Sequence, residues 1–467
     1  MRAFLLNRSE YIGNTNDGQV LLDFLRTEQQ LTGTKQACRE GDCGACLVLS
    51  GQCINGVMHY QAVNSCLLPL GLIQGRHIVS IEGLNGEILN PVQQALVDQG
   101  AIQCGFCTPG IVVAITAFLM NAAESSVALA VDALGGNLCR CTGYAGIKRV
   151  LHQLCQQFDL SHSQPQARIS DLIRWGILPD YFADIAMRLA ALPESIHLLK
   201  QQAVNVAGGT DLFVQQAEQL IDQPLAFIDQ AESISINQWQ CTLSASTRIE
   251  TIRQSDKLQA LFPQIADDFK LICSSSIRQQ ATLGGNLVNA SPIGDLSVFF
   301  LALDAQLTIS SWKDERRVSL RHFFLDYKQV DLHQGELISA IDFQYAETPI
   351  RLSFEKVSKR KHLDIASVNS AMSMSVQDDR FQHIHIAVGG VAAIPLYLQQ
   401  SCAFLQNKKI SNSLLKHALA LAQKEISPLS DSRGSEEYKR LLVQQLLIAH
   451  WLKLLPEYVS WGDFNEF

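Results

Sequence analysis

The chain has 467 residues, of which 47% are hydrophobic and 18% charged, and its formal net charge is −8. Such a composition supplies apolar material for several cores, and the length predicts two to four domains. The absence of long Lys/Arg runs argues against a nucleic-acid surface, and the longest uncharged apolar run, residues 111–120, is about half of a bilayer span. Because residues 1–8 lack the apolar core of a signal peptide, we expect a cytoplasmic protein that does not bind a membrane.

Residues 1–85 alternate short strand-like runs with glycine turns, and a helical pattern interrupts them at 19–31. This predicts a small β-rich domain with one helix. Three cysteines in it have the spacing C-x4-C-x2-C and a fourth follows later, which is the pattern of plant-type [2Fe–2S] ferredoxins. Glycines in the loop remove side chains that would collide with cluster sulfide, and its N–H groups can donate to sulfur. The predicted ligands are Cys38, Cys43, Cys46 and Cys66, whereas Cys53 lies outside the pattern and is expected to be structural.

Residues 86–158 have a helical period, with a threonine and a proline opening one helix at 108–109 and an apolar stripe on the last one at 147–158. A second set of thiols lies here, in two close pairs: Cys104, Cys107, Cys139 and Cys141. Each pair precedes a helix, so two helix starts could present four thiolates to one site. Structural zinc is an alternative for four thiolates, but the neighbouring ferredoxin-type loop favours a second iron–sulfur cluster.

After a polar linker at 159–170, residues 171–347 mix strands and helices. They contain neither a G-x-G-x-x-G fingerprint after a strand nor a Walker A loop. Two glycine turns, at 208–209 and 284–285, supply bare backbone. The first could bring N–H groups to an anion such as a diphosphate, although alone it is more often a plain turn. Short polar residues follow the second turn and suit ribityl or ribose hydroxyls: Asn289, Ser291 and Asp295.

Residues 348–467 combine a strand pattern at 381–388 with a helical tail. Four histidines in the C-terminal half have no ligand-like partner nearby in the sequence, so we interpret them as structural or surface residues: His322, His333, His383 and His385.

Several motifs resemble one family. The stretches QCGFCTPG at 103–110 and GNLCRCTGY at 136–144 resemble the second iron–sulfur domain of the xanthine oxidase family of molybdenum hydroxylases. The stretches CREGDCGAC at 38–46 and AVNSCLLPL at 62–70 resemble its first, and the two glycine-rich segments are similar to its FAD domain.

The resemblance implies a multidomain α+β fold. Its expected parts are a β-grasp ferredoxin-like domain at 1–85, a four-helix [2Fe–2S]-binding domain at 86–158, an α+β FAD-binding domain of the PCMH or vanillyl-alcohol-oxidase-like type at 171–347, and a C-terminal α+β subdomain like that of the CO dehydrogenase flavoprotein at 348–467.

The resemblance also implies the residues around the cofactors. FAD contacts are expected at Asn205, Val206, Ala207, Gly208, Gly209, Thr210, Asp211, Leu212, Ile272, Thr282, Leu283, Gly284, Gly285, Asn286, Asp295, Ile338 and Lys356. Gln103 would approach the pterin of a molybdenum cofactor, with the helical-domain cluster nearer the molybdenum and the ferredoxin-like cluster nearer the flavin. One departure is that the family continues with an arginine-containing stretch where this chain has Leu396-Tyr397-Leu398.

Iron–sulfur clusters carry single electrons and NAD accepts a hydride, whereas flavin can exchange electrons with both. The resemblance therefore implies a small, electron-transfer subunit without catalytic residues of its own, linking purine oxidation on a large molybdopterin-binding subunit to NAD+. Since the sequence stops at Phe467, we expect that large subunit to be a separate chain, in a dimer of heterodimers. Two alternatives stay open: another molybdenum hydroxylase, acting on aldehydes or N-heterocycles, and a molybdenum-free redox-sensing or electron-transfer flavoprotein.

Overall fold

The computed structural model describes residues 1–193, 203–228, 230–345, 350–360 and 362–464. The chain divides into two compact units. Unit 1 comprises Met1–Ile228 and Ser274–Gln280, and unit 2 comprises Asp229–Cys273 and Ala281–Phe467. Among the described residues, no helix has the length and apolar character needed to cross a membrane.

Unit 1 begins with a five-stranded sheet of order β2-β1-β5-β3-β4. Its strands are β1 (Arg2–Leu6), β2 (Ser9–Gly13), β3 (Leu47–Ile54), β4 (Val57–Asn64) and β5 (His77–Val79). Strand β1 pairs parallel to β5, and the other pairs are antiparallel. A helical turn, α1 (Leu21–Asp23), continues as a π-helical turn at Phe24–Glu28 and buries its apolar face against the sheet. The β-rich domain with one helix predicted from the sequence is therefore present.

Four helices follow: α2 (Pro91–Asp98), α3 (Thr108–Asn121), α4 (Val127–Ala133) and α5 (Ala145–Gln157). Asn90 and Gln93 form a capping box at the start of α2. Helix α3 is buried along almost its whole length because the other helices and the β3–β4 hairpin surround it. The sequence therefore correctly predicted a small helical bundle.

The polar segment at 159–170 is held against this bundle. Arg168, at the start of α6 (Arg168–Arg174), is buried, and its guanidinium donates hydrogen bonds to backbone oxygens of Leu119, Ala122 and Leu160. Burial of so polar a side chain is tolerated because backbone carbonyls accept its N–H groups. Helix α7 (Ile185–Ala190) completes this part of unit 1.

Two segments of the predicted FAD region belong to unit 1. The first contains β6 (Val204–Val206), α8 (Leu212–Leu220) and β7 (Leu225–Phe227), with β6 and β7 paired in parallel. The second contains α12 (Ser275–Arg278). The first segment shares an apolar core with the ferredoxin-type domain, made of Val20, Leu22, Cys46, Cys66, Leu67, Val206, Phe213, Leu220 and Leu225.

Unit 2 contains an antiparallel sheet of order β11-β10-β14-β9-β8. Its strands are β8 (Ile234–Asn237), β9 (Gln240–Ser244), β10 (Gln306–Ser310), β11 (Glu315–Ser319) and β14 (Leu337–Gln344). The helices around it are α9 (Ile249–Gln254), α10 (Asp256–Leu261), α11 (Ile265–Asp268), α13 (Leu283–Val288), α14 (Asp295–Ala302) and α15 (Leu320–Phe323), with a small hairpin of β12 (Phe324–Asp326) and β13 (Gln329–Val330).

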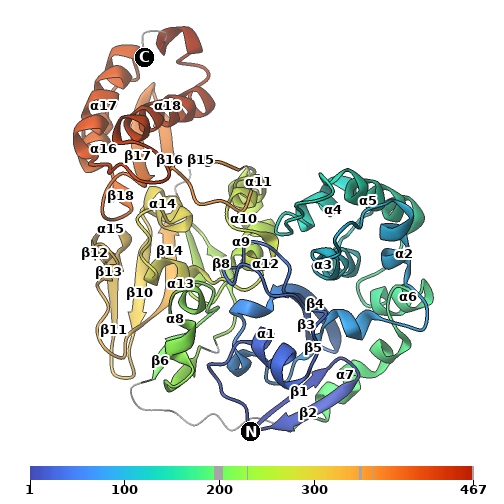
Figure 1. Cartoon of the computed structure of the whole chain (residues 1–467). Helices are drawn as coiled ribbons and strands as arrows, with labels where there is room; N and C mark the ends of the chain where they lie inside the picture. Colours follow the sequence, from blue (N-terminus) through green and yellow to red (C-terminus); the bar gives the residue numbers. More distant parts are fainter. Residues whose placement is uncertain (194–202, 229, 346–349, 361, 465–467) are drawn as a thin grey trace. The chain divides into compact units, whose positions relative to one another are not determined.

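The C-terminal part of unit 2 is a sheet of order β15-β16-β17-β18. Its strands are β15 (Arg351–Val357), β16 (Val368–Gln377), β17 (Arg380–Gly389) and β18 (Leu396–Tyr397), followed by α16 (Gln399–Leu405), α17 (Asn412–Glu425) and α18 (Glu436–Leu454). Helix α14 packs on β16 and β17, and α18 packs on β15 and β16 (Figure 1). The boundary predicted at 347/348 lies outside the described residues.

Candidate functional site

Three of the ferredoxin-type cysteines lie in the loop before β3, and the fourth, Cys66, lies in the helical turn that follows β4. They form two pairs, because the Sγ atoms of Cys38 and Cys43 are 3.2 Å apart and those of Cys46 and Cys66 are 3.4 Å apart. The first pair is half-buried, whereas the second is buried. Cys53, on β3, is exposed and is not part of either pair.

The loop that carries these thiols has the backbone the glycines were expected to supply. Gly41 and Gly44 have φ values of +78° and +66°, in the left-handed region that favours glycine. A Cβ at Gly41 would lie 2.5 Å from Cδ1 of Ile277 and 2.9 Å from Cδ1 of Leu67, so the ends of both side chains would have to shift to admit a larger residue. The N–H of Glu40 points at Sγ of Cys38 at 3.4 Å, which is the kind of donor that stabilises a thiolate.

The second set of cysteines also forms two pairs, and they cross between the two sequence motifs. Sγ of Cys104 lies 3.6 Å from that of Cys141, and burial together with the neighbouring thiol of Cys139 raises the pKa of Cys107 to about 12. Cys104 and Cys141 are exposed, unlike Cys46 and Cys66. The turn after the second motif is fixed by Tyr144, whose hydroxyl accepts a hydrogen bond of 3.0 Å from the N–H of Cys139.

Paired thiols fit binuclear clusters better than single metal ions. Each iron of a [2Fe–2S] cluster takes two protein ligands, so a pair per iron is expected. A tetrahedral zinc site would bring all four sulfurs to about 3.8 Å from one another, given Zn–S bonds of about 2.3 Å. Within the described part of the chain, no three metal-binding side chains meet at a single-ion position. The hydrogen bond between Cys38 and Cys43 lowers the pKa of Cys38 to about 5 and raises the pKa of Cys43. The protonation of either thiol therefore depends on the other.

The two cysteine loops touch each other within unit 1. The N–H of Leu138 donates to the carbonyl of Cys43 at 3.0 Å, and Asn137 donates to the carbonyl of Gly44 at 3.4 Å. Gly110, in the first turn of α3, lies so close that a Cβ would be 2.0 Å from the oxygen of Gly44. The loops that carry the two sets of thiols are therefore held against each other by these contacts.

The first predicted flavin segment connects β6 to α8. Asn205 and Val206 lie on the strand, Gly208 to Asp211 form the turn, and Leu212 begins the helix. Gly209 has a φ of +74°, so the turn needs glycine there. Because Val206 and Phe213 share a core with Cys46 and Cys66, this turn lies beside the ferredoxin-type thiols.

The second predicted flavin segment lies in unit 2. The hydroxyl of Thr282 accepts a hydrogen bond of 3.2 Å from the N–H of Gly285 and so caps α13, which contains Leu283 and Gly284. A Cβ at Gly284 would approach Cβ of Ala245 to 2.8 Å. Oδ1 of Asn286 is buried without a partner among the described residues, which leaves an acceptor for a bound group. The N–H groups of Leu283 and Gly284 donate to the carbonyls of Thr247 and Ala245, so the backbone of this segment is held by the fold and the Asn286 oxygen is the polar atom it leaves unpaired.

Two predicted flavin residues form an ion pair with each other. Nζ of Lys356 lies 2.7 Å from Oδ2 of Asp295, and it also donates to the carbonyl of Leu271, next to the buried Ile272. The lysine side chain is only 3% exposed. Asn369, which the sequence did not single out, donates to Oδ1 of the same aspartate at 2.5 Å. The predicted Ile338 is buried on β14, opposite Ile309 of β10.

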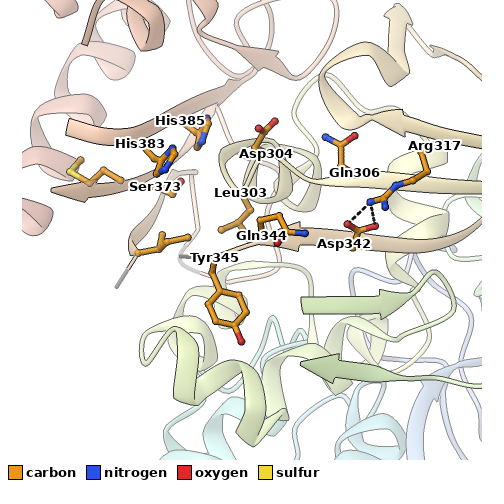
Figure 2. Close-up of a pocket in the computed structure, with 12 residues that line it drawn as sticks. Leu303, Asp304, Gln306, Arg317, Asp342, Gln344, Tyr345, Ser373, His383 and His385 are labelled. Atoms are coloured by element: carbon orange, nitrogen blue, oxygen red, sulfur yellow. Dashed lines mark hydrogen bonds and ion pairs between the residues drawn. The ribbon is translucent and has the colours of Figure 1, made fainter. Parts of the chain in front are cut away.

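A cavity of about 330 Å³ in unit 2 is lined by a different set of residues (Figure 2). Asp342 in its wall is paired with Arg317, and His385 is hydrogen-bonded to Tyr397 at 2.9 Å. Tyr397 belongs to the stretch that departs from the family pattern, and it forms the edge strand β18. These contacts agree with the structural interpretation of His385. No predicted cluster or flavin residue is among the residues that line the cavity.

Comparison with protein families matches four domains in chain order. They are a 2Fe-2S iron-sulfur cluster binding domain (residues 4–70), a [2Fe-2S] binding domain (80–152), an FAD binding domain in molybdopterin dehydrogenase (181–343) and a CO dehydrogenase flavoprotein C-terminal domain (353–454). The chain is therefore an FAD and [2Fe–2S] module of the molybdenum hydroxylase family. Such a module transfers electrons through its clusters and its flavin.

Individual relatives agree with this class. The chain is 26% identical to xanthine dehydrogenase/oxidase of Rattus norvegicus over 97% of its own length and 39% of that protein's. It is 25% identical to aldehyde oxidase 1 of Macaca fascicularis, over 94% and 38% of the two lengths. The chain thus spans about two fifths of these relatives. A carbon monoxide dehydrogenase structure from Hydrogenophaga pseudoflava, 24% identical, matches 55% of this chain and 92% of its own with a TM-score of 0.50, which supports the fold.

Proposed function

We propose that this chain is the small subunit of a xanthine dehydrogenase. In this role it carries electrons from hypoxanthine or xanthine oxidation on a molybdopterin-binding large subunit, through two [2Fe–2S] clusters and FAD, to NAD+. When bound, the clusters supply one-electron steps and the flavin links them to two-electron steps. The observation that carries the proposal is the arrangement of unit 1, where the loops that carry the two sets of thiols touch and one set adjoins a glycine turn.

The exposure of the thiols suggests the direction of transfer. Cys104 and Cys141 are exposed, and three apolar side chains near them are also exposed, at 38% for Ile102, 46% for Phe106 and 44% for Leu138. Large exposed apolar groups around a polar centre are typical of an interaction surface. Gln103 is exposed on the same surface. We infer that the large subunit docks here and brings its pterin to Gln103.

The ferredoxin-type thiols serve the flavin side in this proposal. Cys46 and Cys66 are buried in the core that also holds the β6–α8 turn. Leu67 and Ile277 cover Gly41 of the cysteine loop and keep water from it. Exclusion of water and N–H donors to sulfur are the means by which a protein sets the potential of such a cluster.

The choice of a purine substrate rests on the xanthine dehydrogenases among the relatives. Aldehyde oxidases match with nearly the same identity, so an aldehyde or N-heterocycle dehydrogenase is the second candidate. The substrate site itself is expected on the partner, outside this chain.

The test is purification of the tagged chain from its own cells, with metal and flavin analysis. We expect iron, FAD and a co-purifying molybdenum subunit, and NADH formation with xanthine exceeding that with an aldehyde. Iron and FAD without a molybdenum partner would favour a redox-sensing or electron-transfer flavoprotein. Zinc in place of iron would overturn the proposal. A Gln103→Ala variant should lower the rate at which xanthine reduces the clusters while leaving their content unchanged.

A further inference from the structure

The segment Ser274–Gln280 belongs to unit 1, although the residues before and after it belong to unit 2. It contacts the ferredoxin-type domain through two side chains, at Asn64 of β4 and at Gly41 of the cysteine loop. Ser276 accepts a hydrogen bond of 2.9 Å from Asn64, whose Oδ1 lies 3.7 Å from Sγ of Cys46. The side chain of Ile277 covers Gly41 of the same loop.

The last residue of the segment joins two different sites. The amide nitrogen Nε2 of Gln280 donates to the carbonyl of Leu67 and to the carbonyl of Gly208, each at 2.8 Å. Leu67 directly follows the predicted ligand Cys66, and Gly208 is in the predicted flavin turn between β6 and α8. A side-chain amide has two N–H donors, so each carbonyl takes one. One side chain therefore links a cluster-ligand segment to a flavin-binding segment.

The burial of Gln280 limits the movement of the side chain that connects the two carbonyls. Its side chain is 8% exposed, within the packed interior of unit 1. Its Oε1 is buried without a hydrogen-bond partner among the described residues, so an acceptor is open at the point where the two segments meet. Buried polar atoms are rarely left unpaired in a working protein, and a donor on the bound cofactor would satisfy this one.

We propose that Gln280 is a positioning residue that couples FAD binding to the ferredoxin-like cluster, an inference that rests on the proposed cofactors. A displacement of the Gly208 carbonyl when FAD binds is passed through the planar amide to Leu67 and so to Cys66. Coupling between two sites is reciprocal, so reduction of this cluster changes the affinity for FAD by the same factor as FAD changes the cluster's reduction equilibrium. A tenfold factor corresponds to a shift of about 59 mV for a one-electron couple.

The experiment measures this coupling in the purified complex. The midpoint potential and the electron paramagnetic resonance spectrum of both clusters are recorded with FAD bound and after its removal, for the wild type, Gln280→Met and Gln157→Met. Methionine keeps the length of glutamine but donates no hydrogen bond, and Gln157 is an exposed glutamine at the end of α5. A Cys141→Ser variant assigns the signal of the helical-domain cluster.

In the wild type and in Gln157→Met, we expect removal of FAD to shift the potential of the ferredoxin-like cluster and leave the other cluster unchanged. In Gln280→Met that shift should be at least halved, and the FAD dissociation constant should rise about tenfold, or about 1.4 kcal/mol. Gln280→Asn, which is too short to reach both carbonyls, should give an intermediate shift.

The proposal would be overturned if the potential of the ferredoxin-like cluster in the wild type were the same with and without FAD. It would also be overturned if Gln280→Met showed the same FAD-dependent shift as the wild type. If Gln280→Met loses its clusters, the Gln280→Asn and wild-type measurements decide. A preparation of the wild type without iron or FAD would instead count against the proposed function, so the two failures are distinguishable.

Discussion

The contact between the two cysteine loops can be tested at Gly110, in the first turn of α3. A Cβ at this position would lie 2.0 Å from the oxygen of Gly44 and 3.1 Å from its carbonyl carbon. Helix propensity alone predicts that Gly110→Ala stabilises the protein by up to about 1 kcal/mol. Overpacking costs about 1–3 kcal/mol or more, and here the obstacle is backbone, which cannot rotate away as a side chain could. We therefore expect a net destabilisation of about 1–2 kcal/mol.

The assay is thermal unfolding of the purified protein together with its iron content. About 1 kcal/mol shifts the melting temperature of a unit of this size by about 2–4 °C, so the variant should melt several degrees lower. Gly86→Ala is the matched control, because its Cβ would lie no closer than 3.5 Å to any atom. That change should leave stability unchanged or raise it by about 0.4–1 kcal/mol. A Gly110→Ala protein that melts above the wild type with all of its iron would refute the packing argument.

Three further changes test other parts of the chain. Lys356→Met removes the cation from the Asp295 carboxylate, which is 12% exposed and keeps its hydrogen bond from Asn369, and should cost about 3 kcal/mol in chemical denaturation. Lys453→Met breaks a more exposed pair and should cost less than about 1 kcal/mol, and equal losses would contradict us. Burial lowers the pKa of His77 to about 4, so below pH 6.5 the unfolded chain binds a proton that the native state does not. Stability should fall as the pH drops from about 6.5 to about 4, by up to about 1.4 kcal/mol per pH unit, and identical pH slopes for wild type and His77→Gln would count against this. Cys38→Ser should lose the iron of one cluster, whereas Cys53→Ser should lose none; iron analysis decides, and an iron loss in both would contradict the ligand assignment.

The local signals in the sequence predicted the fold well. Spacing and glycines identified the cysteine loop before β3, because close ligands must share one tight turn. The change from a strand period to a helical period separated the sheet from the bundle. The pairing of Cys104 with Cys141 was not predictable, since it depends on how α3 and α5 are placed. The segment at 159–170 was predicted as a linker from its polarity, but the carbonyls that accept from Arg168 come from α3 and the chain after it.

Long-range contacts account for what the sequence missed. Lys356 and Asp295 were both expected near the flavin, yet their mutual ion pair joins residues far apart in the chain. Asn369 and Gln280 are buried amides, which in a sequence look like ordinary surface residues. Their importance depends on partners that only the folded chain brings together.

The return of Ser274–Gln280 to unit 1 has a consequence for dissection of this protein. A fragment that ends at Ile228 would lack Ser276, which accepts the hydrogen bond from Asn64, and Ile277, which covers Gly41. Such a fragment should aggregate and be prone to proteolysis. One cleavage cannot release either unit intact, because the chain leaves unit 1, comes back for seven residues and leaves again. Expression of the halves as separate polypeptides would need this short stretch grafted onto the first half.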